Sequence, residues 1–130
     1  MAHIEYRAPD EMLDSALFLD LAQRVWPGTY QAGRVAEALK RTINITAWDG
    51  PALVGCVRVL SDGYFFGTIP EILIHPDYRQ TGIGRNLMEL AWQLSPTGLF
   101  FGAQPGNEGF FEKCGFERSL PSFVKQKPRS

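Results

Sequence analysis

The apolar residues in the N-terminal third of the chain follow first a strand-like and then a helical spacing. Residues 3–7 alternate weakly, which predicts a short first strand. Asp10 stands where a helix N-cap is expected, and apolar residues then recur every three or four positions, as on one face of a helix. The sequence Trp26–Pro27–Gly28 ends this helix, and residues 30–40 carry a second helical pattern. The predicted face of the first helix comprises Met12, Leu13, Ala16, Leu17, Leu21 and Val25.

The central part of the chain predicts three antiparallel strands. Ile43, Ile45 and Ala47 alternate as in a strand, and Asp49–Gly50 is a hairpin signal with residues 53–60 as the returning strand. A turn at residues 61–63 leads into a third strand over residues 68–74.

The end of this third strand leads into a glycine-containing loop and a helix. Pro76 and a polar turn follow the strand, and the helix extends to about Leu94. Gly82 and Gly84 remove side chains where the backbone must turn, so that successive N–H groups of the first helical turn can point at one anion. The positive end of the helix dipole favours the same ligand, and the sequence therefore predicts a phosphate or pyrophosphate site.

The C-terminal quarter predicts two further strands and a short helix. Residues 99–103 form an apolar run typical of a buried strand, residues 108–114 form a helix closed by Gly115, and residues 122–126 form a last strand. The resulting order, β-α-α-β-β-β-α-β-α-β, predicts a mixed α/β fold.

Two segments carry a resemblance to a known family. Residues 79–84 match the pattern Q/R-x-x-G-x-G/A, and residues 110–116 resemble the pattern F-Y-x-x-x-G-F. The pair resembles the GNAT superfamily of acyl-CoA-dependent N-acetyltransferases. The resemblance covers the whole chain and implies one domain over residues 1–130, with a mixed, mostly antiparallel central sheet flanked by helices.

The resemblance also implies acetyl-CoA as the co-substrate. In such proteins two parallel strands splay apart, and the pantetheine arm lies in the gap, where backbone groups lack strand partners. Arg79 and Arg85 flank the loop and can add charge-assisted contacts to phosphates. Gln104 stands where the family often has an asparagine, and Asn107 follows three residues later. The implied cofactor residues are Ile72, Leu73, Ile74, Arg79, Gln80, Thr81, Gly82, Ile83, Gly84, Arg85, Gln104, Asn107 and Phe111.

Glu71 is the candidate catalytic base. It is the acid of the apolar 69–74 segment, which the resemblance places beside the acetyl end of the cofactor. A carboxylate there can accept the ammonium proton directly or through water. The alternative is a structural role, with Glu71 facing solvent or paired with a cross-strand residue such as Arg58. The backbone N–H of Leu73 or Ile74 is the candidate donor to the thioester oxygen.

Phe111 marks a departure from the family pattern, which usually has a tyrosine beside the CoA thiol. A phenyl ring has no proton to give, so protonation of the thiolate falls to water, to the product ammonium, or to another tyrosine such as Tyr64 or Tyr78. The loss is expected to cost about 10–100-fold in rate, near the low end for acid–base catalysis.

Trp26 and Tyr30 are the candidate acceptor pocket. The resemblance associates the connection between the first two helices with acceptor binding, which favours an aromatic or long apolar amine. Core packing or a homodimer face explains these aromatic residues equally well. Cys114, His75 and His3 are interpreted as packing or surface residues rather than catalytic ones.

Composition narrows the class of protein. The chain has 130 residues, of which 45% are apolar and 21% charged, and its net charge of −1 gives no electrostatic reason to expect nucleic-acid binding. Two cysteines without a neighbouring His/Cys cluster indicate reduced thiols and no metal site. No signal-peptide pattern is present and no run approaches ~18 apolar residues, so we expect a cytoplasmic protein without membrane association.

The leading hypothesis is an N-acetyltransferase that moves acetyl from acetyl-CoA to a primary amine of a small molecule, by direct attack in a ternary complex. A non-catalytic acyl-CoA-binding or sensor module is the alternative that Phe111 and Gln104 would fit. Acetylation of a protein N-terminus or lysine ranks lower, because the chain leaves little surface for binding a peptide. A dinucleotide-binding interpretation is poorer still, because the G-x-G-x-x-G spacing is absent.

Overall fold

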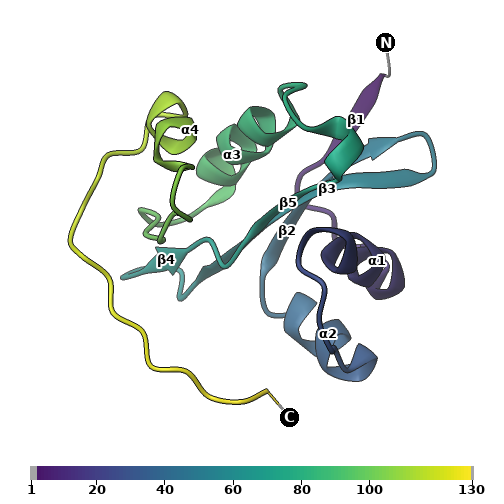
Figure 1. Ribbon diagram of the computed structural model, residues 1–130, viewed down its shortest axis with the longest axis horizontal. Coiled ribbons are helices and arrows are strands. Elements are labelled where there is room, and N and C mark those ends of the chain that lie inside the picture. The colour runs from purple at the N-terminus through teal and green to yellow at the C-terminus, as the bar shows by residue number, and fades with distance from the viewer. Residues whose placement is uncertain (1–2, 130) are drawn as a thin grey trace.

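The computed structural model describes residues 3–129. Their backbone forms a five-stranded sheet with helices on both faces (Figure 1). The strand pairings are antiparallel, which confirms the mixed fold with a mostly antiparallel sheet. β4 and β5 follow one another along the edge of β3 that β2 leaves free. The strands are β1 (Ile4–Arg7), β2 (Ile43–Asp49), β3 (Ala52–Ser61), β4 (Gly67–Thr68) and β5 (Ile72–Ile74).

Helices bury both faces of the central strands. α1 (Ser15–Val25) and α2 (Ala32–Leu39) cover one face, and α3 (Ile83–Leu94) covers the other (Figure 1). β2 is consequently buried at five consecutive positions instead of alternating between buried and exposed residues. Leu87 and Met88 lie in the core on the α3 side, and Phe18 and Leu21 lie in the core on the α1 side. Within residues 3–129, every helix is too short or too polar to cross a membrane.

The first helix begins later than its sequence pattern predicts. Asp14 is the N-cap, and its carboxylate accepts a hydrogen bond from the Ala16 N–H at 2.8 Å. Asp10 is instead buried in the preceding segment, where its carboxylate accepts a hydrogen bond from the Thr46 hydroxyl at 2.7 Å. Met12, which the pattern assigned to the apolar face, is exposed because the helix has not yet begun at that residue.

The predicted strand over residues 68–74 is broken into β4 and β5. In β4 Thr68 pairs with Leu60, and in β5 Ile72 pairs with Val57. Between these two pairs β3 has two residues, whereas the opposing segment has the three residues 69–71. The extra residue is a β-bulge, and Pro70 within it has no N–H with which to continue the ladder.

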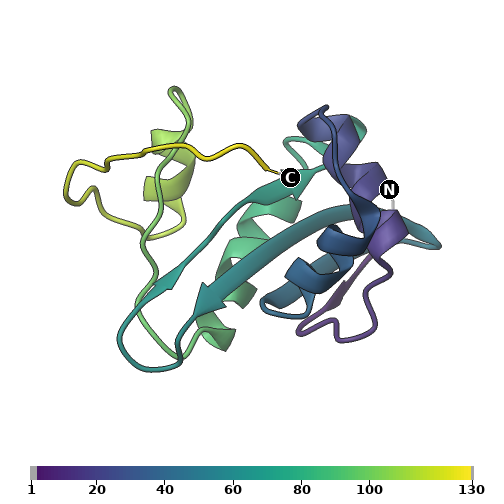
Figure 2. The same cartoon turned by 90° about the horizontal axis from the view of Figure 1, so that it is seen from below.

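The strands predicted over residues 99–103 and 122–126 do not form. Phe100 makes one parallel bridge with Thr68, and the chain then leaves the sheet to form α4 (Glu108–Lys113). The C-cap of α4 is Cys114, and Gly115, the predicted closing glycine, follows it with a φ of 93°. Residues 116–129 form an extended tail that runs back toward α1 and α2 (Figure 2). Both predictions are wrong because these segments find no strand partner along their length, and Phe123 in the tail is exposed.

Candidate functional site

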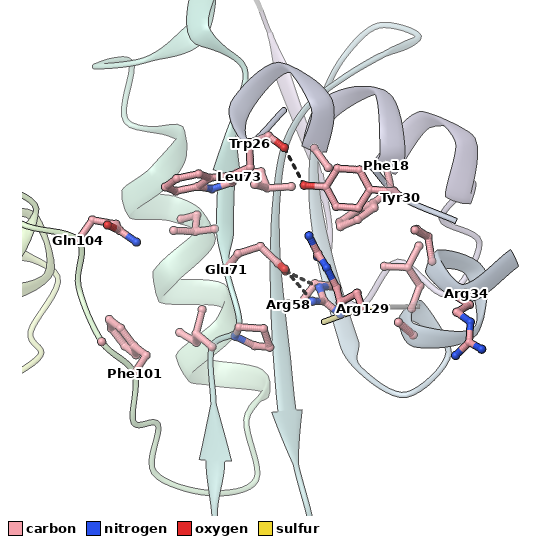
Figure 3. A pocket seen from close by; sticks show the side chains of 18 of the residues that line it. Phe18, Trp26, Tyr30, Arg34, Arg58, Glu71, Leu73, Phe101, Gln104 and Arg129 are labelled. Atoms are coloured by element: carbon pink, nitrogen blue, oxygen red, sulfur yellow. Dashed lines mark hydrogen bonds and ion pairs between the residues drawn. The ribbon is translucent and has the colours of Figure 1, made fainter. Parts of the chain in front are cut away.

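A cleft of about 1060 Å³ opens between β5 and residues 101–111 and extends to α1 and α2 (Figure 3). Eight of the residues singled out from the sequence line it. They are Trp26, Tyr30, Glu71, Ile72, Leu73, Gln104, Asn107 and Phe111. Figure 3 shows Gln104 and Phe101 on the opposite side of the cleft from β5. The strand and the segment 101–111 therefore diverge, as the family resemblance implies.

β5 presents an unpaired backbone edge on the side away from β3. The Glu71 carbonyl accepts a hydrogen bond from an N–H of β3 at 3.3 Å, and the His75 N–H donates to a carbonyl of β3 at 2.8 Å. Because the direction of hydrogen bonding alternates along an antiparallel strand, Leu73 also faces β3, and Ile72 and Ile74 direct their N–H and C=O groups outward. Within residues 3–129 no strand pairs with that edge. Of the two candidate donors to a thioester oxygen, this geometry favours Ile74 over Leu73.

The loop between β5 and α3 has the backbone geometry of an anion site. It follows a short 3-10 helix, η1 (Pro76–Tyr78), and Gly82 caps α3 in a left-handed conformation with φ of 88°. Gln80 also has a positive φ, of 61°. No side chain caps the first turn of α3 within the described part of the chain, and Arg79 and Arg85 are exposed on either side of it. Thr81 is exposed and Ile83 is buried in the core. The loop lies outside the cleft lining, at the end to which β5 leads.

Gly84 does not form part of the turn, as the sequence predicted, but allows close packing of α3 and α4. It lies inside α3 rather than in the turn, and a Cβ atom built on it would lie 3.1 Å from Cζ of Phe110. The missing side chain therefore makes room for an aromatic ring of α4 against the first turn of α3. Of these two glycines, Gly82 has the left-handed backbone that the turn requires, and Gly84 is helical.

Glu71 is bound by Arg58 on the face of the sheet that α1 and α2 cover. Both carboxylate oxygens accept hydrogen bonds from the guanidinium, one of them at 2.7 Å (Figure 3). The Arg58 side chain is 16% exposed and that of Glu71 is 24% exposed. Burial acts to lower the pKa of Arg58, but the hydrogen bond and the charge of Glu71 outweigh it, so that the pKa is raised. The ion pair named as the structural alternative is thus present, and it also fixes the carboxylate at the cleft.

The tyrosines considered as replacement acids lie elsewhere. The Tyr78 hydroxyl donates to Asp49, a hydrogen bond that raises the pKa of Tyr78, and Tyr64 is 80% exposed in the turn between β3 and β4. Neither lines the cleft. Tyr30 does line it, and its hydroxyl donates to the Trp26 carbonyl at 2.7 Å.

Cys114 and the two histidines lie outside the cleft, in the core, at a helix cap or at the surface. Nδ1 of His75 accepts a hydrogen bond from the Asp77 N–H at 3.1 Å, which caps η1. Cys114 packs against the core, and burial raises the pKa of its thiol. His3 is exposed. Across residues 3–129, no group of three or more His, Cys, Asp or Glu side chains could hold a metal ion.

The cleft also contains two residues that sequence analysis did not single out. Arg34 on α2 and Arg129 in the tail line it, and the Arg129 guanidinium lies 5.1 Å from the centroid of the Tyr30 ring. Arg34 follows Gln31 by about one helical turn, so an extension of the acceptor segment into α2 would have found it. No local pattern marks Arg129, because its position depends on the path of the tail.

The Acetyltransferase (GNAT) domain family matches residues 41–118, more than half of the chain. The protein therefore belongs to the GNAT acetyltransferase family.

Individual relatives and solved structures agree with this assignment. A glucosamine 6-phosphate N-acetyltransferase from Schizosaccharomyces pombe is 35% identical over 57 residues, which are 41% of this chain and 51% of that protein. The chain spans about half the length of the curated relatives it matches. A probable acetyltransferase from meticillin-resistant Staphylococcus aureus has a TM-score of 0.79 at 16% identity, over 95% of this chain and 100% of that one. AAC(6')-Iy has a TM-score of 0.75 at 15% identity, over 98% of this chain and 100% of that one.

Proposed function

We propose that the protein is an acetyl-CoA-dependent N-acetyltransferase that acts on a primary amine of a small molecule. The open edge of β5 carries this proposal, because the outward N–H and C=O groups of Ile72 and Ile74 need hydrogen-bonding partners. A pantetheine arm has amides that can pair with them. The uncapped first turn of α3, to which the strand leads, suits a pyrophosphate.

The known proteins support this choice of co-substrate and acceptor. The Schizosaccharomyces pombe relative is named as an acetyltransferase of glucosamine 6-phosphate, and AAC(6')-Iy was solved with a bisubstrate analogue that joins CoA to acetylneamine. The first name describes acetyl transfer to a small-molecule amine, and the second structure joins CoA to a small molecule.

Residues of the chain take three roles in the proposed reaction. Acetyl-CoA supplies the acetyl group as a thioester, whose C–S bond breaks as the amine nitrogen forms the amide bond. CoA then leaves as a thiolate that takes a proton from water or from the ammonium of the product. Glu71 accepts the proton of the acceptor ammonium, directly or through water, so that a neutral amine attacks. The Ile74 N–H donates to the thioester oxygen, where negative charge develops. Arg58 holds the Glu71 carboxylate in a fixed orientation.

A non-catalytic acyl-CoA-binding module is the second candidate. Phe111, which lines the cleft, offers no proton in place of the usual tyrosine, and both oxygens of Glu71 are already bound by Arg58. These observations favour binding without turnover.

Calorimetric titration with acetyl-CoA, followed by a thiol-release assay over a panel of amines, separates the two candidates. The enzyme binds acetyl-CoA and releases one thiol for each acetylated amine found by mass spectrometry. Binding without thiol release above background would instead favour the sensor module, and failure to bind acetyl-CoA would contradict both.

A further inference from the structure

The charged side chains of the cleft are unevenly balanced. Within residues 3–129 they are Arg34, Arg58, Glu71 and Arg129. Arg58 and Glu71 bind each other. Arg34 and Arg129 form no ion pair with another described residue. The cleft therefore has an excess of two positive charges, although the whole chain has a net charge of −1.

Both arginines line the cleft on the side of α1 and α2, and in Figure 3 Arg129 lies beside the Arg58–Glu71 pair, whereas Arg34 lies farther along, on α2. Arg34 lies one turn after Gln31, the N-cap of α2, which also lines the cleft and makes no side-chain cap hydrogen bond. Arg129 lies over the ring of Tyr30. The hydrogen bond from the Tyr30 hydroxyl to the Trp26 carbonyl fixes the position of that ring. The loop before α3 lies outside this region and has its own flanking arginines, so the phosphates of CoA do not account for the charge.

We infer that the acceptor amine carries an anionic group, a carboxylate or a phosphate, which Arg34 and Arg129 bind. The inference rests on the proposed acetyl transfer and names the substrate class of that site. Guanidinium groups bind both kinds of anion through paired N–H donors. This chemistry differs from the aromatic or long apolar amine expected from the sequence, because one face of Tyr30 is covered by a charged group.

The same charges also determine which amines the cleft repels. An anionic group on the acceptor offsets the charge of the two arginines, so that the ammonium of the same molecule can approach Glu71 without net repulsion. A diamine or polyamine meets the opposite situation, because its second ammonium group would lie against the arginines. We therefore expect anionic amines to be the best acceptors and polyamines the worst.

Matched pairs of amines test this order. The thiol-release assay gives kcat/KM for β-alanine against propylamine, for 2-aminoethyl phosphate against ethanolamine, and for glucosamine 6-phosphate against glucosamine, with spermidine as the polycation. The anionic member of at least one pair should exceed its partner by about tenfold or more. The carboxylate pair and the phosphate pairs show which anion the cleft accepts.

Charge-neutral variants locate the effect. Arg34→Gln and Arg129→Gln should each lower kcat/KM for the preferred anionic amine by about tenfold and change the uncharged partner by less than about threefold. Arg41→Gln is the matched control, because Arg41 is exposed just beyond α2 and does not line the cleft. Equal rates within every pair, or equal losses for charged and uncharged amines in the variants, would overturn the inference and leave the proposed acetyl transfer intact.

If no amine releases thiol, the proposed function fails, and a binding experiment decides the inference alone. β-Alanine and 2-aminoethyl phosphate are titrated by calorimetry into protein saturated with CoA. Binding of either compound that is weakened in Arg34→Gln and Arg129→Gln, but not in Arg41→Gln, supports the anion site. Absence of binding to the wild-type protein overturns it.

Discussion

The two ends of the cleft offer a ligand different kinds of group, backbone atoms at one end and side chains at the other. At the end that we propose for acetyl-CoA, called the cofactor end, the available groups are backbone atoms, namely the open edge of β5 and the first turn of α3. At the end that we propose for the amine, called the acceptor end, they are side chains, with Trp26, Tyr30 and Arg34 on or between two helices and Arg129 on the tail. A backbone site depends on element order and a few glycines, whereas a side-chain site depends on which residues the fold brings together. The first can be retained while the second changes.

Glu71 lies between the two ends, and its replacement should have the largest effect. Glu71→Gln keeps the size of the side chain but removes the proton acceptor, so we expect kcat to fall by about 10²–10⁴-fold. The acetyl-CoA Kd should change by less than about threefold, because backbone groups form the cofactor end. Thiol release and calorimetry measure the two quantities.

Arg58→Gln is the control for this variant, because it breaks the same ion pair and keeps the carboxylate. An equal fall of kcat in both variants, accompanied by the same loss of melting temperature, would assign Glu71 a structural role.

The backbone nature of the cofactor end can be tested at Gly82. Gly82→Val places a branched side chain at a φ of 88°, a conformation that costs about 1–3 kcal/mol. If the loop relaxes to avoid this cost, the acetyl-CoA Kd should rise by about 10–100-fold. Gly33→Ala in α2, where nothing lies within 4 Å of the added atom, should leave the Kd unchanged. A wild-type Kd in Gly82→Val would argue against the loop as the phosphate site.

Phe111 provides a test in the direction of improved activity. Its ring lines the cleft and packs edge-on against Phe101, with the ring centroids 4.7 Å apart. Phe111→Tyr adds a hydroxyl that can protonate the leaving thiolate, and kcat should rise by up to about tenfold if that step limits the rate. Phe100→Tyr adds the same hydroxyl outside the cleft and should give no gain. An unchanged kcat in Phe111→Tyr would show that thiolate protonation is not limiting.

The smallest effect concerns the free energy of unfolding, through the thiol of Cys56 in the core on the α1 side of the sheet. Burial, together with the charge of Glu71, raises the pKa of the Cys56 thiol above its ordinary value of 9.0. The folded protein therefore keeps this thiol neutral at pH values where the unfolded chain ionises it. The free energy of unfolding should be insensitive to this group below its ordinary pKa, and above pH 9 it should fall by up to about 1.4 kcal/mol per pH unit.

Urea unfolding at neutral and alkaline pH measures this slope. Cys56→Ala should flatten it more than Cys114→Ala, because Cys56 is fully buried and Cys114 only partly. Equal slopes in the wild-type protein and Cys56→Ala would contradict the prediction.

The sequence predicted those parts of the molecule that depend on local signals. The hairpin at Gly50 and the left-handed turn at Gly82 are examples, and both glycines have positive φ values. Asp10 shows where local signals fail. Asp10 and Asp14 are both good N-caps by residue type, and only the tertiary hydrogen bond from Thr46 to Asp10 decides between them.

Pairing between distant segments was harder to predict than burial. The apolar run over residues 99–103 indicates contact with other apolar groups, and it contains no information on whether β5 continues beside it. The bulge at Pro70 separates the two registers of β3, and only the assembled sheet shows its effect. Arg129 lies at the acceptor end for a similar reason, since a tail without regular structure gives no period from which to infer its position.

The open edge of β5 also has a consequence for self-association. A free strand edge is usually a template on which another molecule can add a strand, and long flat edges lead to aggregation. Here the edge is limited to three residues, with Pro70 two residues before the first of them, and it lies at a cleft whose opposite side is formed by residues 101–111. A flexible small molecule can reach such an edge more readily than the rigid strand of a neighbouring protein. β5 can thus keep its unpaired backbone groups available in a crowded solution without itself acting as a template for intermolecular sheets.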